Sequence, residues 1–176
     1  APSDRRFAAG ELRFAVIGAN RSVLNAAQWL ERVGASLFGA RSMTEAGEAD
    51  PVPLALLVAG DSLPDAPGPA DGPTRIHFWD YEVGRPGVGA FASAVSGVSC
   101  VIGKPDGPPG ILPVHLPEQW AGMFGANLAL GLQFARSEGT PRPRRIDISA
   151  ADILRAFAEQ NSGNHAGVPY GWRRNG

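Results

Sequence analysis

Residues 12–40 read LRFAVIGANRSVLNAAQWLERVGASLFGA, and this stretch decides the fold. It opens with an apolar run, 12–17, that has the length of a buried strand. After a short loop, apolar residues recur at helical spacing over 23–33, with Ser22 where we expect the helix N-cap. A second apolar run fills 35–40. The stretch therefore predicts a strand–helix–strand unit with a right-handed crossover, which is how a parallel sheet begins.

The rest of the chain continues this alternation of apolar runs and helical patterns. Two stretches rich in Pro, Gly and Asp interrupt it, and they predict loops over 61–73 and 103–110. Ser149 and Asp152 stand three residues apart, the spacing of a capping box at a helix start. We expect further strands over 53–59, 74–80 and 146–148, and helices over 88–96, 112–139 and 150–160.

Composition limits the classes of function. The chain has 176 residues, a net charge of -1 and one cysteine, Cys100. A charge this small gives no bulk attraction to nucleic acid or to a membrane surface, so we expect neither as a partner. A single cysteine forms no internal disulfide, and no apolar run is long enough to span a bilayer. We therefore expect a cytoplasmic protein.

Several motifs for known chemistries are missing. The loop after the first strand, GANRS, lacks the second and third glycines of a dinucleotide fingerprint. His77, His115 and His165 stand far apart without cysteines or carboxylates at ligand spacing, so we expect no metal. No serine lies in a GxSxG motif, and the apolar neighbours of Cys100 predict a buried, inert thiol.

Glu118 is the most informative acidic residue of the sequence. It follows Pro117 at the start of the long apolar helix expected over 112–139. In the first turn of a helix, the macrodipole and unpaired amides stabilise a negative charge by about 0.3–1 kcal/mol. A carboxylate held at the mouth of a central helix is also well placed to act as a nucleophile or base. Residue type and position alone leave both interpretations open.

A family resemblance adds to this interpretation. Residues 91–154, FASAVSGVSCVIGKPDGPPGILPVHLPEQWAGMFGANLALGLQFARSEGTPRPRRIDISAADIL, resemble the order of elements in class III CoA-transferases. At the other end, 12–17 and RVGASLFGAR at 32–41 match the family's first strand and its "LGADVIKVE" segment. This family includes formyl-CoA and carnitine CoA-transferases, with α-methylacyl-CoA racemases as relatives. The resemblance implies a Rossmann-like three-layer α/β domain with a mainly parallel sheet over 1–160, and an extended tail over 161–176.

The resemblance also implies an activity and a site. In the family, the residue at the position of Glu118 is usually an aspartate that attacks an acyl-CoA thioester and then carries CoA to a second carboxylic acid. Here the carboxylate is kept on a side chain one methylene longer. The residues that would contact coenzyme A are Asn20, Arg21, Ser22 and Arg41. A racemase needs a histidine near Val88, so the resemblance disfavours racemase chemistry.

The chain is less than half as long as a usual member of the family, so its domain is incomplete relative to the family. We expect it to need a complementary chain, either a CoA-transferase-family subunit or a same-type subunit. Three explanations stay open: one subunit of a split enzyme, a fragment of a longer protein, or a degenerate relative kept as a scaffold. A small-molecule-binding α/β domain unrelated to the family is a further alternative.

Overall fold

The computed structural model describes residues 12–60, 62, 72–102, 107–113, 115–139 and 141–161. The strands are β1 (Arg13–Ile17), β2 (Ser36–Gly39), β3 (Ala55–Ala59), β4 (Thr74–Trp79) and β5 (Arg145–Ser149). The helices are α1 (Arg21–Arg32), α2 (Met43–Gly47), α3 (Gly89–Val95), α4 (Val98–Ile102), α5 (Leu116–Ser137) and α6 (Ala150–Asn161).

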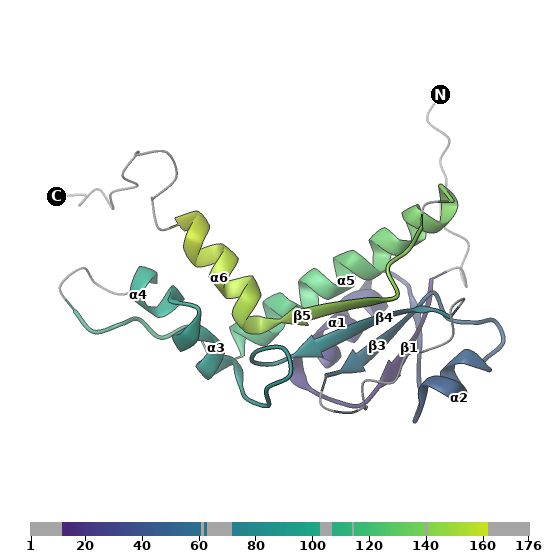
Figure 1. Ribbon diagram of the computed structural model, residues 1–176, viewed down its shortest axis with the longest axis horizontal. Helices are drawn as coiled ribbons and strands as arrows, with labels where there is room; N and C mark the ends of the chain where they lie inside the picture. Colours follow the sequence, from purple (N-terminus) through teal and green to yellow (C-terminus); the bar gives the residue numbers. More distant parts are fainter. Residues whose placement is uncertain are drawn as a thin grey trace.

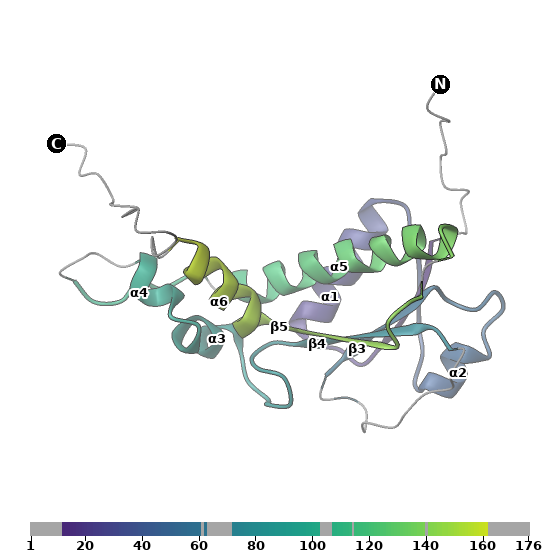
Figure 2. The ribbon, with the colours of Figure 1, turned by 45° about the horizontal axis from the view of Figure 1, so that its top comes forward.

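The five strands form one sheet in the order β2-β1-β3-β4-β5, and every neighbouring pair is parallel. Helices α1 and α5 cover one face of this sheet, and α2 lies on the other (Figures 1 and 2). All five residues of the central strand β3 are buried, as expected for a strand covered on both faces. The predicted Rossmann-like three-layer α/β fold is therefore confirmed.

Alternate residues of the strands supply two separate cores. In β3, Leu57 packs towards the core under α1 and α5, whereas Leu56 and Val58 join the smaller core under α2. This alternation follows from the two-residue period of a strand. The core under α1 and α5 contains most of the buried apolar side chains of the described residues, so that face holds the long helix in place.

Glycines set the position of α5. A Cβ atom built on Gly122 would lie 2.6 Å from Asn25 Cβ and 2.8 Å from the backbone oxygen of Ser22, so α1 and α5 touch backbone to backbone there. A Cβ atom on Gly125 would lie 2.1 Å from the ring of Phe78 in β4. Gly122 thus lies against α1, and Gly125 lies against the sheet. These two contacts fix the position of α5, and therefore the position of its first turn, relative to α1 and the sheet.

Helices α3, α4 and α6 gather beyond the carboxyl ends of the strands, beside the start of α5 (Figure 1). The aromatic rings of Trp120 in α5 and Phe157 in α6 meet edge to face, with centroids 4.9 Å apart. In open parallel sheets, ligands bind at this carboxyl edge. The first turn of α5 therefore lies in the region where a site is expected.

Two local predictions need correction, and two helices were missed. Asn20, not Ser22, caps α1: its side chain accepts a hydrogen bond from the backbone N–H of Val23 at 2.9 Å, and the helix begins at Arg21. Helix α5 begins at Leu116, four residues later than expected, because the preceding His115 has left-handed backbone geometry with φ of 69°. The short helices α2 and α4 were not predicted.

The capping pair before α6 is confirmed. The backbone N–H of Asp152 donates to the hydroxyl of Ser149 at 3.0 Å, and that hydroxyl donates to the Asp152 carboxylate at 2.6 Å. Of the expected tail over 161–176, only Asn161, the last residue of α6, falls within the described residues. Most of the loop expected over 61–73 also lies outside them.

Two glycines of α5 make a matched test of this packing. Gly122→Ala should lower the free energy of unfolding by about 1–3 kcal/mol, because the new methyl group meets the α1 backbone. Gly131→Ala should leave stability unchanged or raise it by up to about 1 kcal/mol, because no described atom outside the neighbouring backbone of α5 lies within 4 Å of its Cβ position and alanine favours helix. Urea denaturation of both variants measures the difference, and equal effects would contradict the close contact of α1 with α5.

Candidate functional site

Glu118 lies in the first turn of α5, as predicted, and only 2% of its surface is exposed. Its Oε1 atom accepts a hydrogen bond of 2.9 Å from the backbone N–H of Gly89, the first residue of α3. Its Oε2 atom is buried without a hydrogen-bond partner among the described residues. The carboxylate is therefore held by one oxygen only.

Two neighbours of Glu118 control its surroundings. A Cβ atom on Gly89 would lie 2.2 Å from Oε2, so only glycine leaves room for the carboxylate at this point. His115, immediately before α5, places Nδ1 at 3.8 Å from Oε1, and its side chain is 40% exposed. A protonated imidazole at that distance would form an ion pair with Glu118. Sequence reasoning missed Gly89, because its contact with Glu118 joins residues 29 positions apart, and it considered His115 only as a metal ligand.

Glu118 borders a cavity of about 620 Å³, within the range of roughly 300–1,000 Å³ that small-molecule sites occupy. Its walls come from α3, α4, the segment before α5 and the first turn of α5. The lining residues are Val88, Ala90, Ser93, Ala94, Ser99, Cys100, Pro109, Gly110, Ile111, Leu112, Pro113, His115, Pro117 and Glu118. A buried carboxylate at an apolar cavity is the most distinctive chemical feature of the described residues.

Cys100 is among these lining residues, and its side chain is exposed. The prediction of a buried thiol is therefore wrong. Apolar neighbours in the sequence suggested burial, but α4 is a helix of five residues in which only Val98 is buried. The remaining face of α4 turns Cys100 towards the cavity.

The residues predicted to contact coenzyme A after β1 lie at the start of α1, the helix that packs against α5. Ser22 is fully buried, and its hydroxyl donates to the carboxylate of Asp80 at 2.6 Å. The backbone N–H groups of Arg21 and Ser22 donate to the same carboxylate, each at 2.9 Å. Asn20 donates from its amide to the backbone oxygen of Phe78 at 2.7 Å. Asp80, which sequence reasoning missed, thus occupies the N-terminus of α1.

Arg41 lies apart from this group. It follows the edge strand β2, its side chain is exposed, and its backbone N–H donates to Glu45 at 2.8 Å. It lines neither the cavity beside Glu118 nor the hollow between α1 and α5. Asn20, Arg21 and Ser22 therefore stand at the start of α1, after β1, while Arg41 stands after the neighbouring parallel strand β2, at the same carboxyl edge of the sheet.

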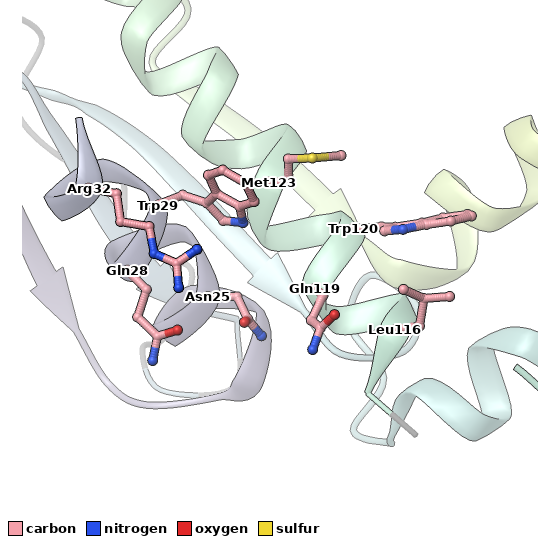
Figure 3. A pocket seen from close by; sticks show the side chains of 8 residues that line it. All are labelled: Asn25, Gln28, Trp29, Arg32, Leu116, Gln119, Trp120 and Met123. Carbon is pink, nitrogen blue, oxygen red and sulfur yellow. The ribbon is translucent and has the colours of Figure 1, made fainter. Parts of the chain in front are cut away.

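A second hollow of about 340 Å³ lies between α1 and α5 (Figure 3). Figure 3 shows the amide side chains of Asn25 and Gln119 between the two helices, with Trp120 pointing away from α1. The guanidinium of Arg32 lies 5.5 Å from the ring centroid of Trp29. This hollow is lined by carboxamides and carries no carboxylate among its described residues, so it differs in chemistry from the cavity beside Glu118.

A polar cluster occupies β4 and β5. Asp147 accepts hydrogen bonds from Arg145 at 2.8 Å and from the indole of Trp79 at 3.1 Å. Burial raises the pKa of Asp147, but these hydrogen bonds and the charges of Arg145 and His77 together outweigh burial and hold that pKa below its ordinary value. The hydrogen bond to Asp147 raises the pKa of Arg145.

His77, the register partner of Asp147, is buried. Burial lowers its pKa; the charge of Asp147 opposes this shift, and Arg75 adds to it. This cluster is a structural feature of the sheet rather than part of the cavity.

Two negative findings apply to the part of the chain that the structure describes. No group of three or more His, Cys, Asp or Glu side chains comes together there as metal ligands. None of the described helices combines the length and the apolar character that crossing a bilayer requires.

Comparison with known proteins supports the fold. No family model matches the chain, and no curated protein does. Three crystal structures of Rv3272 from Mycobacterium tuberculosis match it with TM-scores of 0.61, 0.61 and 0.62 at 14% to 15% sequence identity. One of them is described as a hypothetical protein, and one is a variant with a single aspartate changed to alanine. Each match covers 85% of this chain but only 55% to 57% of Rv3272, and at this identity it shows the fold alone.

The His77 environment makes stability depend on pH. A histidine whose folded-state pKa lies below its ordinary value of 6.5 binds fewer protons in the folded state than in the unfolded state. The contribution of neutral His77 to the free energy of unfolding is therefore complete above about pH 6.5, and it is lost as the pH falls towards the lowered pKa. Asp147 adds a similar loss only below its ordinary value of 3.8.

We expect His77→Gln to flatten the fall in unfolding free energy between about pH 7.5 and about pH 5.5, because glutamine does not titrate. Urea denaturation at both pH values measures this slope for the wild type and the variant. An unchanged slope would show that His77 is not the group whose protonation destabilises the fold in this range.

Proposed function

We propose that this chain supplies the nucleophilic carboxylate, Glu118, of a class III CoA-transferase-like enzyme and acts together with a complementary chain. One observation carries the proposal: a buried carboxylate borders a cavity of small-molecule size, with one oxygen fixed by Gly89 and the other without a hydrogen-bond partner among the described residues. The sequence resemblance places the family's carboxylate at this same position. The proposal includes a cytoplasmic location, which suits a chain with one cysteine.

The proposed reaction moves CoA between two carboxylic acids. The Glu118 carboxylate attacks the thioester carbonyl of an acyl-CoA, the CoA thiolate leaves, and a glutamyl–acyl anhydride forms. The thiolate then attacks the glutamyl carbonyl, which releases the first acid and leaves CoA bound to Glu118 as a thioester. A second carboxylate attacks this thioester, and the returning thiolate attacks the new acyl carbonyl. The products are the new acyl-CoA and a regenerated Glu118 carboxylate.

The surrounding residues have distinct parts in this proposal. The N–H of Gly89 and the first turn of α5 stabilise the ionised Glu118 that must attack. Arg21 and Arg41 carry the exposed cationic side chains that we assign to the phosphates of coenzyme A. Asn20 and Ser22, whose side chains are engaged with Phe78 and Asp80, hold the start of α1, which carries Arg21.

A non-catalytic scaffold subunit of a heteromeric enzyme of this family is the second candidate. It is favoured by the same hydrogen bond, because a carboxylate that accepts the first N–H of α3 from the first turn of α5 also stabilises both helix starts. Under this candidate, Glu118 joins the two helices and the complementary chain carries the chemistry.

Glu118→Gln separates the two candidates. Glutamine keeps an oxygen that can accept the Gly89 N–H, so the fold should survive, but the amide is no nucleophile. In the native assembly we expect CoA transfer to fall by at least about a thousandfold. Asp152→Asn is the matched control, since Asp152 is also a first-turn acid but is largely exposed, and it should leave activity unchanged.

Chemical trapping checks the same proposal directly. Incubation of the assembly with acyl-CoA, followed by borohydride or hydroxylamine, should modify the peptide that contains Glu118 and leave the Glu118→Gln variant unmodified. An adduct found only on the complementary chain, together with unchanged activity of Glu118→Gln, would establish the scaffold role instead.

A further inference from the structure

We propose that the cavity beside Glu118 receives an uncharged, apolar acyl group, so that the acids exchanged at this site are aliphatic or aromatic monocarboxylic acids. This inference rests on the proposed function and adds the class of substrate. It follows from the walls of the cavity, from the hydrogen bonds of its serines and from the charge of Glu118.

The described walls of the cavity are mainly apolar and hold no lysine or arginine. The apolar and small lining residues are Val88, Ala90, Ala94, Pro109, Gly110, Ile111, Leu112, Pro113 and Pro117. Ile111 is 92% exposed and Val88 is 51% exposed, so large apolar side chains at the cavity are left uncovered by the described chain. An apolar ligand that covers such surface gains about fourfold in affinity for each methylene group it buries.

The serines of the lining offer no free hydroxyl hydrogen to a ligand. The hydroxyl of Ser93 donates to the backbone oxygen of Gly89 at 3.0 Å. The hydroxyl of Ser99 donates to the backbone oxygen of Ser93 at 3.3 Å. Both hydrogens point to the backbone of α3, so these two polar residues do not make the cavity a site for a polar acyl group.

A second carboxylate on the acyl group would be unfavourable in this cavity. It would leave water for a wall with no lysine or arginine among its described residues, and it would approach the Glu118 carboxylate, which has the same charge. His115 is the only described lining residue that can become cationic, and its Nδ1 is directed to Glu118 at 3.8 Å. Dicarboxylic acyl groups such as succinyl are therefore excluded from the expected substrates.

Cys100 provides a reporter for the cavity, because it is the chain's single cysteine, is exposed and lines the wall. In the native assembly, the rate at which a thiol-reactive maleimide modifies Cys100 would be followed by mass spectrometry of the peptide that contains it. The probes are hexanamide and adipamic acid, which share an amide and chain length and differ in a terminal carboxylate. Butanamide and octanamide extend the neutral series.

We expect hexanamide to slow modification of Cys100 and adipamic acid to have no effect at the same concentration. Apparent affinity should rise about fourfold for each added methylene along the neutral series. Ala94→Lys places a cation on an exposed lining position of α3 and should reverse the preference, so that adipamic acid protects Cys100. Equal protection by hexanamide and adipamic acid, or by neither, would overturn the inference.

The two proposals fail in different ways. If acyl-CoA labels Glu118 while the neutral amides leave Cys100 unprotected, the transferase proposal stands and the assignment of an apolar acyl group is wrong. If the neutral amides protect Cys100 and no acyl-CoA labels Glu118, the cavity has the inferred preference but Glu118 is not the nucleophile.

Discussion

The hydrogen bond from the Gly89 N–H to Glu118 Oε1 is the contact on which the candidate site depends. This buried hydrogen bond joins the first residue of α3 to the first turn of α5 at the carboxyl edge of the sheet. The position of α5, and so of Glu118, is set by two close contacts. Gly122 lets α5 pack directly on α1, and Gly125 lets it pack on Phe78 of the sheet. A carboxylate placed this way is oriented by the whole parallel core rather than by a flexible loop.

A buried carboxylate is costly unless its charge is stabilised. The first turn of α5 and the N–H of α3 both offer partial positive charge to Glu118, and together they offset part of that cost. The same stabilisation serves a structural acid and an attacking nucleophile, so position in the helix alone does not separate the two roles. Two observations favour the catalytic role of Glu118. Its second oxygen, Oε2, has no hydrogen-bond partner among the described residues, and its side chain borders an apolar cavity.

Sequence patterns predicted the fold where local rules decide it. The apolar runs and helical spacing of residues 12–40 predicted the parallel strand–helix–strand start, and Pro117 predicted that Glu118 lies in a first helical turn. Predictions failed where the role of a side chain depends on a residue far away in the sequence. Asp80 engages the hydroxyl of Ser22 from 58 positions away, which leaves the N-cap role to Asn20. The contact of Gly89 with Glu118 is equally non-local, so no spacing rule could find it.

The most direct test of the central claim is transfer of oxygen from substrate to Glu118. With an acceptor acid labelled with oxygen-18 in its carboxylate, each turnover of the proposed reaction leaves one labelled oxygen on the nucleophilic carboxylate, because the returning CoA thiolate takes the acyl group and not the bridging oxygen. The account predicts oxygen-18 in the Glu118 side chain of the turning-over assembly, located by fragmentation mass spectrometry. CoA transfer that proceeds without label at Glu118 would contradict it.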